Sequence, residues 1–582
     1  MIHSGDGFPR GGPEAPVGRR KSILYWAPER ESLRDLRARL LALPQCEATP
    51  EGLVYQQTEL RWRLETKAID LLDRLHSEYF NLVILDLRSR SSHGFEAQVE
   101  EAMTLLDAMD STADIEARFG FHRVVALVSG DEDRTDRLIA TLGARHVGRV
   151  LRGPAPGERL GETSDAFARL LLDEMLRLML ERRPGLRALC CSGGGITGIY
   201  FELGALKCLS DCLRPAGVLN ELDLYFGISA GATVTGLLAN GYTVDDCLAS
   251  LAGVSEGELP PTNLSVLRLQ MIDAANLADR VGRALLAFGQ TLWRARHGRL
   301  RVSLESLLLD YSDLFGPPLR AAPLEQKLRE LFTAPGRSND FRSVRRRLYI
   351  GATDQDLRRH VLFGSPGHDD VPISVAVQAS SSLHPAFSST QIKDRFFCDG
   401  AVTATSHVPE AIRMGADLLF VIDPFLPYVS KEPGYARTRG MLYNIDQDVR
   451  TLSYTRFERL REAALRRHPA VSSYTFLPAN SLRRTLSVNP MDHRPYLSIW
   501  RGAYLSTLRR IQHLRYRMEG DLALHGMGLD TSRAEEIAER LRGKEKTTLD
   551  DFFPGGRRRA SAGRRLKRPA LSSSEPAPEP QP

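Results

Sequence analysis

The sequence predicts an α/β protein with two sheet domains and a helix-rich C-terminal part. Apolar strand candidates at 22–26, 81–85 and 123–128 alternate with polar stretches of helix length, which indicates a small doubly wound domain. Two further places, at 187–213 and 222–239, have an apolar strand that runs through a glycine turn into a helix. A chain of 582 residues is long enough for both domains.

These patterns divide the chain into segments. In order, we expect a disordered 1–20, a small α/β domain at 21–155, a linker helix at 156–184, a larger α/β domain at 185–428 with a helical insertion at about 263–335, a helix-rich part at 429–545, and a disordered basic tail at 546–582. The insertion has leucines beside arginines, which is typical of a lid or an interfacial surface and equally of a buried helical layer.

The glycine-rich segment Ser-Gly-Gly-Gly-Ile-Thr-Gly at 192–198 lies where the strand at 187–191 turns into a helix. Such a turn leaves N–H groups without partners, and they point at one spot. Gly193, Gly194 and Gly195 are therefore candidates for binding an oxyanion through their backbone.

A serine elbow follows one β-α-β unit later, as Gly-Ile-Ser-Ala-Gly at 227–231. Ser229 follows a strand candidate and opens a helix candidate, which is the setting that exposes a nucleophilic serine. The segment Gly-Val-Ser-Glu-Gly at 253–257 fits the same pattern, but no strand enters it and no helix leaves it. We therefore predict Ser229 as the nucleophile and not Ser255.

A nucleophilic serine needs a proton acceptor, and Asp399 is the best candidate. It ends the short apolar run that begins at Phe396, and Gly400 follows it. The C-terminal end of a strand is where open α/β sheets carry their chemistry. The alternative interpretation is an ordinary Asp-Gly turn.

From 187 to 424 the chain resembles the patatin-like phospholipase family. The resemblance rests on the glycine loop, the elbow and the segments Ala352-Thr353-Asp354, Ala379 to Pro385, Asp399-Gly400-Ala401 and Gly415-Ala416-Asp417. It implies a modified α/β-hydrolase sheet and a lipid acyl hydrolase of the phospholipase or lysophospholipase A type. It implies a Ser229–Asp399 dyad, an oxyanion hole at Gly193, Gly194 and Gly195, and supporting motif residues Gly198, Gly227, Gly231, Gly400 and Ala401. In this family the position of Thr197 usually carries Arg or Lys.

In such a dyad Asp399 takes the Ser229 proton directly. An ordinary aspartate is a poor base at neutral pH, so we expect a dry, enclosed site that raises the Asp399 pKa. One alternative is a Ser-His-Asp esterase with His384 or His407 as the base. Another is a catalytically silent lipid-binding or signalling scaffold.

The N-terminal pattern resembles a response-regulator receiver domain. Asp86 closes the middle strand, where that family has its phospho-acceptor, and Ser129 closes the next strand, where a switch hydroxyl sits. The acidic pair expected after the first strand is replaced by Trp-Ala-Pro-Glu at 26–29, and Arg152 stands near the place of a lysine. We interpret Asp86 as a vestigial phospho-acceptor in a domain that has lost phosphorylation.

Composition limits the setting of the protein. No apolar run approaches the roughly 18 residues of a membrane span, and the first 20 residues lack an apolar signal core. Seven cysteines without paired metal-ligand spacing favour a reduced cytoplasmic location. We further expect a peripheral position at the inner membrane and no metal or cofactor. The expected partners are a phospholipid or other acyl lipid, a transient membrane surface and a second copy bound through the N-terminal domain, but no nucleic acid, because the net charge of +6 comes mainly from the tail.

Overall fold

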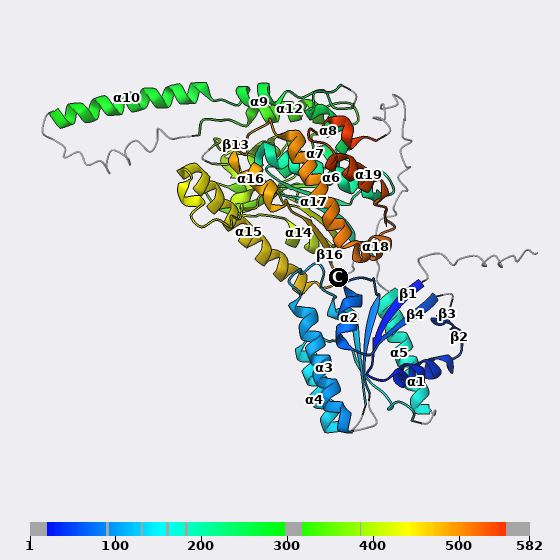
Figure 1. Ribbon diagram of the computed structural model, residues 1–582. Helices are drawn as coiled ribbons and strands as arrows, with labels where there is room; N and C mark the ends of the chain where they lie inside the picture. Colours follow the sequence, from blue (N-terminus) through cyan, green and yellow to red (C-terminus); the bar gives the residue numbers. More distant parts are fainter. Residues whose placement is uncertain are drawn as a thin grey trace, which may run out of the picture.

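The computed structural model describes residues 20–56, 58–88, 92–129, 132–158, 162–180, 184–255, 257–296, 317–384 and 386–554. The predicted disordered segments 1–20 and 546–582 therefore lie largely outside the described residues. Figure 1 shows two bodies, a smaller N-terminal one in blue to cyan and a larger one in green to red.

The N-terminal domain has a seven-stranded sheet in the order β2-β3-β4-β1-β5-β6-β7. Its strands are β1 Arg20–Trp26, β2 Cys46–Thr49, β3 Gly52–Tyr55, β4 Thr58–Glu65, β5 Leu82–Leu87, β6 Val124–Val128 and β7 Val150–Arg152. The strands from β4 to β7 are parallel, and among them the chain order is 2-1-3-4-5, the flavodoxin-like order. The predicted doubly wound fold is confirmed, and the three predicted strands are β1, β5 and β6.

Helices cover both faces of this sheet. One face carries α2 Ala68–Leu75, α3 Ser92–Ser111 and α4 Glu132–Ala144, and the other carries α1 Arg30–Leu41 and α5 Glu162–Leu180. The helix predicted as a linker at 156–184 is α5. Its Phe167, Leu171 and Met175 are buried in the same cluster as strand residues of β1 and β5, so α5 belongs to the N-terminal domain.

The larger domain has an eight-stranded sheet in the order β13-β14-β11-β10-β8-β15-β16, with β12 paired to β11. The strands are β8 Leu186–Cys191, β10 Leu224–Ile228, β11 Arg347–Asp354, β12 Arg359–Phe363, β13 Thr390–Ile392, β14 Arg395–Asp399, β15 Ala416–Ile422 and β16 Ser472–Phe476. Five are parallel, from β11 to β16, while β12 and β14 pair antiparallel with β11, and β13 pairs antiparallel with β14. The predicted boundary at 428 is wrong, because the edge strand β16 pairs with β15.

Most helices of the larger domain share one buried cluster on one face of the sheet. They are α6 Gly195–Cys212, α7 Ala230–Ala239, α8 Val244–Leu251, α12 Ala322–Phe332, α13 Ile373–Ser380, α16 Asn480–Val488, α17 Tyr496–His513, α18 Arg515–Leu524 and α19 Ser532–Arg542. The other face is covered by α14 Val408–Arg413 and α15 Met441–Arg467. The remaining short pieces are β9 Leu213–Arg214 paired with β17 Gly528–Leu529, and the 3-10 turns η2 Phe121–Arg123, η3 Val218–Asn220, η5 Gly400–Val402, η6 Ala436–Thr438 and η7 Leu549–Phe552.

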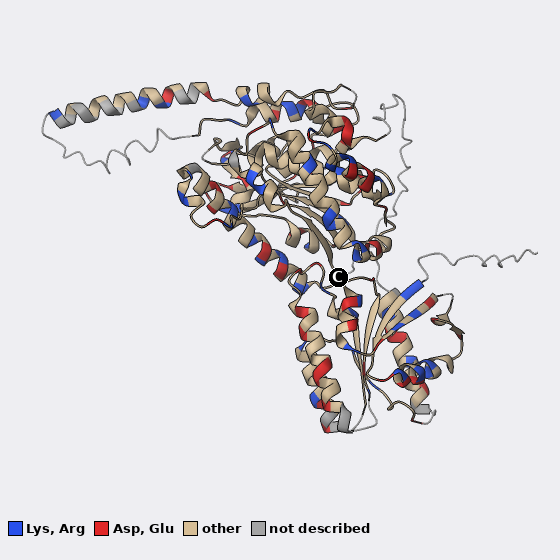
Figure 2. Cartoon of the chain, in the orientation of Figure 1, with Lys and Arg blue, Asp and Glu red and all other residues tan. Residues whose placement is uncertain are grey.

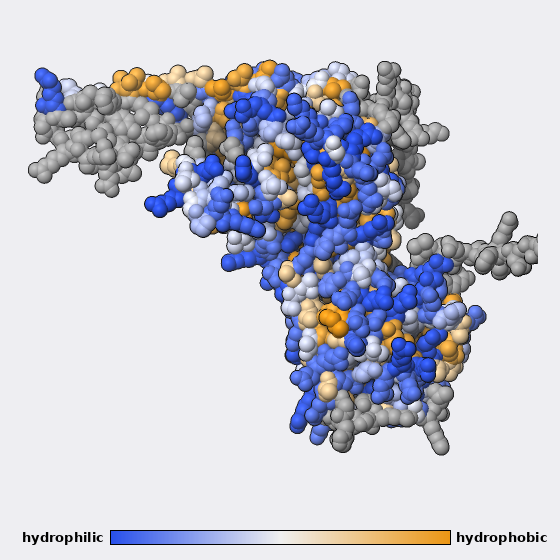
Figure 3. Space-filling view, viewed as in Figure 1, coloured by the Kyte–Doolittle hydropathy of each residue, from blue (hydrophilic) through white to orange (hydrophobic). Residues whose placement is uncertain are grey.

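The predicted insertion at 263–335 contains α9 Leu264–Gln270, α10 Ala274–Arg296 and α12, and of these α12 packs in the buried cluster of the larger domain. Figure 1 shows α10 extending away from the body, and Figure 3 shows hydrophobic residues along its upper side. Leu285 and Leu286 are 67% and 69% exposed, so the alternative prediction of a buried helical layer is wrong for α10. Among the described residues, no helix has the length and apolar character to cross a membrane.

The two bodies meet at the segment that follows α3. Figure 2 shows acidic residues on α3 and residues of both charges along α15, which approaches the N-terminal domain at its C-terminal end. Residues 114–118 contact side chains of α15, α17 and α18 through ion pairs and hydrogen bonds.

Candidate active site

Ser229 occupies the sharp turn between β10 and α7, with φ 54° and ψ −116°. Positive φ is uncommon for a residue with a side chain and costs of order 1–3 kcal/mol. The flanking glycines make room for the turn. A Cβ on Gly227 would lie 2.3 Å from Thr235 Oγ1, and one on Gly231 would lie 2.3 Å from the Cys191 carbonyl oxygen. The predicted strand-turn-helix setting is present.

The second Gly-x-Ser-x-Gly match has no such setting. Ser255 is exposed in the irregular segment that follows α8, and no strand enters it.

A hydroxyl from another part of the chain holds the elbow. The Ser229 N–H donates to Ser380 Oγ at 2.8 Å, and the Ser380 hydroxyl donates to the Gly351 carbonyl at 2.6 Å. Ser380 is fully buried at the end of α13. Ser380 belongs to the serine-rich motif noted in the sequence, but its contact with Ser229 could not be predicted, because the two residues are 151 positions apart.

Asp399 lies at the end of β14, and its backbone is fixed on both sides. Its N–H donates to the Ser382 carbonyl at 3.1 Å, and its own carbonyl accepts from Thr353 Oγ1 at 2.9 Å. The Ala401 N–H donates to Asp399 Oδ1 at 2.8 Å. A Cβ on Gly400 would lie 2.3 Å from the Gly351 carbonyl oxygen, so this turn requires glycine.

The Asp399 carboxyl has the electrostatics of a base. Burial raises its pKa to about 6, against the opposing effects of the Ala401 N–H and the Ser229 hydroxyl. Asp399 Oδ2 is buried and has no partner in hydrogen-bond geometry among the described residues, while the Ser229 hydroxyl is close enough to lower the Asp399 pKa. Catalytic hydrogen bonds often close only with substrate. Ser229 is 8% exposed, which agrees with the enclosed site expected from the sequence.

The glycine loop lies against the elbow. A Cβ on Gly193 would be 3.3 Å from Ser229 Cβ, and α6 begins at Gly195. Gly194 has φ +155° and Gly195 has φ +65°, conformations that favour glycine. In the described part of the chain, the N–H groups of Gly193, Gly194 and Gly195 have no hydrogen-bond partner. They are donors available to an oxyanion at the start of a helix.

Thr197 stands where Arg or Lys is usual in the family, and it makes local hydrogen bonds instead. It is buried, its N–H donates to the Pro490 carbonyl at 3.1 Å, and its hydroxyl donates to the Gly194 carbonyl at 3.3 Å. Gly198, one residue on, packs on the helix that follows the elbow, since a Cβ there would be 3.3 Å from Ala230 Cβ. The loop is therefore ordered without Arg or Lys at this position.

The two candidate histidine bases are occupied elsewhere. His407 is buried, and its Nε2 is hydrogen-bonded to His360 Nε2 at 3.0 Å. His384 is exposed and bonded to Ser389 Oγ at 3.1 Å. Burial lowers the pKa of both rings. Across the described ranges, no histidine is hydrogen-bonded to Ser229 or Asp399.

Asp86, the predicted vestigial phospho-acceptor, is sealed in the N-terminal domain. Its Oδ1 accepts from Arg88 Nε at 2.9 Å, and its Oδ2 accepts from Arg88 Nη2 at 2.8 Å and from the Tyr25 hydroxyl. Asp86 and Arg88 are both fully buried side chains. The carboxylate is therefore enclosed by its own partners, and the loss of phosphorylation stays a prediction.

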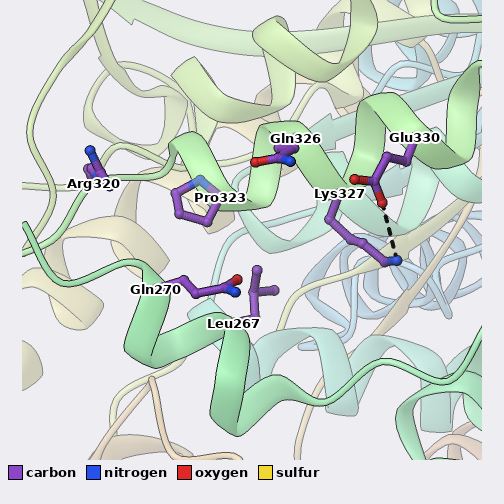
Figure 4. A pocket seen from close by; sticks show the side chains of 7 residues that line it. All are labelled: Leu267, Gln270, Arg320, Pro323, Gln326, Lys327 and Glu330. Carbon is purple, nitrogen blue, oxygen red and sulfur yellow. Dashed lines mark hydrogen bonds and ion pairs between the residues drawn. The ribbon is translucent and has the colours of Figure 1, made fainter.

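A cavity of about 520 Å³ lies between α9 and α12, where Figure 4 shows Lys327 paired with Glu330, but its lining includes neither Ser229 nor Asp399. The described residues contain no group of three or more His, Cys, Asp or Glu that could hold a metal ion. All seven cysteines are free, and six of them are buried.

The model of the patatin-like phospholipase family matches residues 189–412, which confirms the resemblance found in the sequence. No curated protein matches the chain.

Three solved structures are similar to the chain at low identity. VipD from Legionella pneumophila is 14% identical, with 61% of this chain and 73% of that chain covered and a TM-score of 0.25. The type III effector protein ExoU is 16% identical, with 63% and 67% covered and a TM-score of 0.22. An adenylate cyclase from Rhodopirellula baltica is 12% identical, with 27% and 94% covered and a TM-score of 0.15. The match that identifies this part of the chain is that of residues 189–412 to the patatin-like phospholipase family.

Proposed function

We propose that this protein is a lipid acyl hydrolase of the phospholipase A or lysophospholipase type, with Ser229 as nucleophile and Asp399 as base. The family match supports hydrolysis of a lipid ester. The observation that carries the dyad is Asp399 itself, a buried carboxyl with a raised pKa that lies beside the strained serine. Neither candidate histidine is hydrogen-bonded to Ser229 or Asp399, and each is bonded to another side chain instead.

The proposed reaction has two halves. Asp399 Oδ2 takes the Ser229 proton while Ser229 Oγ attacks the ester carbonyl. The negative charge on the tetrahedral intermediate is bound by the N–H groups of Gly194 and Gly195, at the N-terminus of α6. Asp399 then gives its proton to the leaving alcohol. In the second half, water loses a proton to Asp399 as it attacks the acyl-enzyme carbonyl. The bond to Ser229 Oγ then breaks, Asp399 gives the proton to Oγ, and the fatty acid is released.

A fluorophosphonate probe tests the nucleophile. Intact mass and peptide mapping should find one adduct on the wild-type protein, at Ser229, which disappears in Ser229→Ala. Ser255→Ala is the matched control, because Ser255 fits the same five-residue pattern in an exposed position. It should label like the wild type. A well-folded wild-type protein that takes no adduct, with or without lipid vesicles, would favour the silent scaffold instead.

The rate should depend on pH through Asp399. Asp399 must be ionised to accept a proton, and its pKa lies at about 6. We therefore expect kcat/KM to be independent of pH around pH 8 and to fall tenfold for each pH unit below pH 6. A soluble ester measured from pH 4.5 to 8.5 gives this profile. His407→Gln and His384→Ala should retain it. A profile without an inflection near pH 6, or one abolished by either histidine variant, would contradict Asp399 as the base.

We also propose that α10 brings the protein to a lipid surface. Four of its large apolar side chains, Val281, Leu285, Leu286 and Trp293, are 45–69% exposed, and Arg283 and Arg296 on the same helix are exposed as well. An apolar stripe with arginine beside it is typical of helices that lie in the interface of anionic membranes, where each basic residue contributes about 1 kcal/mol.

Replacing both Leu285 and Leu286 by glutamate should weaken binding to anionic vesicles about 100-fold or more, because each exposed leucine contributes about 1.5–3 kcal/mol when it inserts. Turnover of a soluble ester should stay unchanged. Vesicle co-sedimentation measures the effect, and Ile69→Glu is the control, since Ile69 is 61% exposed on α2 of the other domain. Equal loss in both variants would show that α10 has no special part in lipid binding.

A further inference from the structure

A buried carboxylate anchors the N-terminal domain to the larger one. Glu116 lies in the segment between α3 and β6, and its side chain is fully buried. Its two oxygens accept from Arg461 Nη1 at 2.9 Å, from Arg510 Nη2 at 2.8 Å and from the Thr475 N–H at 2.9 Å. These partners come from α15, α17 and β16. A carboxylate buried in this way requires all its partners, because each one compensates lost hydration.

The backbone around Glu116 is held as well. Arg517 on α18 donates to the carbonyls of Glu116 and Arg118, the latter at 2.8 Å. Asp114 adds an ion pair with Arg510. The contact therefore fixes the position of the N-terminal segment against the helices of the larger domain, α15 among them.

Helix α15 also contacts the turn that follows Asp399. Arg456 on α15 donates to the carbonyl of Ala401 and to the carbonyl of Val402, both at 3.0 Å. These two residues belong to η5, the turn that directly follows Asp399. The Ala401 N–H is the donor to Asp399 Oδ1, at 2.8 Å. Arg456 thus holds the turn whose amide orients the proposed base.

One rigid helix joins the two contacts. Arg456 and Arg461 are five residues apart on α15, which corresponds to about 7.5 Å along the helix axis. Figure 1 shows α15 running along the larger body to the top of α3. We propose that Arg456 is a positioning residue for Asp399, and that the N-terminal domain sets its position through Glu116, Arg461 and α15. This inference rests on the proposed role of Asp399.

Arg456→Met is the first test. Arg456 is exposed, so its loss should leave folding intact. The Ala401 N–H lowers the Asp399 pKa, and a looser turn weakens that bond. We expect kcat on a soluble ester to fall about 10- to 100-fold and the acid limb of the pH profile to move up by roughly half a unit, with KM and melting temperature unchanged. Arg456→Lys should restore part of both effects, because an ammonium group also donates to carbonyls.

Arg459→Met is the matched control on the same helix, because Arg459 is exposed and makes no hydrogen bond among the described residues. It should behave like the wild type. If Arg456→Met does the same while the wild type is labelled at Ser229, the positioning role is wrong. A wild type that is not labelled would overturn the proposed function and this inference with it.

Glu116→Gln tests the link to the N-terminal domain. It should lower kcat about 2- to 30-fold and move the acid limb in the same direction as Arg456→Met. The double variant should lose little more than Arg456→Met alone, because both changes act on one turn. Asp107→Asn, on the exposed Asp107–Arg145 pair of the N-terminal domain, is the control and should change neither quantity. A Glu116→Gln protein with a lower melting temperature but the wild-type pH profile, or losses that simply add, would overturn the coupling.

Discussion

Asp399→Asn should lower kcat about 10²–10⁴-fold and stabilise the protein at neutral pH. The loss of rate follows because an amide does not accept the Ser229 proton, and a general base contributes about this factor. The gain in stability follows because burial raises the Asp399 pKa from 3.8 to about 6. At neutral pH, the ionised buried carboxylate therefore lowers the free energy of unfolding of the wild type by about 3 kcal/mol. The asparagine variant does not have this cost.

The sign of the stability effect fixes the pH window. Between pH 3.8 and about 6 the folded protein binds more protons at Asp399 than the unfolded chain does, so wild-type stability falls as pH rises through this window. The melting temperature of Asp399→Asn relative to the wild type should therefore be higher at pH 7.5 than at pH 4. Calorimetry at the two pH values measures the difference, together with kcat.

Asp394→Asn is the control for both measurements, because Asp394 is exposed just before β14. It should change neither kcat nor the dependence of melting temperature on pH. If Asp399→Asn kept more than a tenth of the wild-type rate, another group would be the base. If it were destabilised equally at both pH values, lost hydrogen bonds rather than relief of a buried charge would dominate.

The geometry of the serine elbow, of the Asp399 turn and of the glycine loop could be predicted, because each depends on residues that are close together in the sequence. A turn that forces positive φ on Ser229 needs small neighbours at Gly227 and Gly231, and those neighbours are two residues away on either side. Asp399 was recognisable for the same reason, since the glycine after it is required by the close carbonyl of Gly351. Constraints between residues that are close in the sequence can be recognised from the sequence alone.

The long-range contacts that support the site could not be predicted in this way. Ser380 reaches Ser229 across 151 positions, and Glu116 reaches Arg461 across 345. Strand β16 was missed because Ser-Ser-Tyr-Thr-Phe is too polar to read as a buried strand, although all five residues are buried beside β15. The larger domain therefore extends past its predicted end, and its contact with the N-terminal domain depends on that extension.

Gly194→Val should lower kcat about 10²–10³-fold and change KM only a few-fold, because the oxyanion exists in the transition state and not in the bound ester. Gly194 has φ +155°, and a Cβ there would lie 2.9 Å from Gly198 Cα and 3.0 Å from Pro424 Cγ. A β-branched residue must therefore turn the backbone, and with it the N–H groups at the start of α6. Steady-state kinetics on a soluble ester separate kcat from KM.

The control for Gly194→Val is Gly253→Val, since Gly253 also has positive φ, +77°, but nothing lies within 4 Å of its Cβ position. Both variants strain the backbone, while only the first lies at the proposed oxyanion hole. Gly253→Val should keep the wild-type kcat. A Gly194→Val protein with normal kcat and a much higher KM would assign the loop to ground-state binding of the lipid. If that protein fails to fold, Gly194→Ala provides the same comparison, because one methyl group already meets Gly198 and Pro424 at these distances.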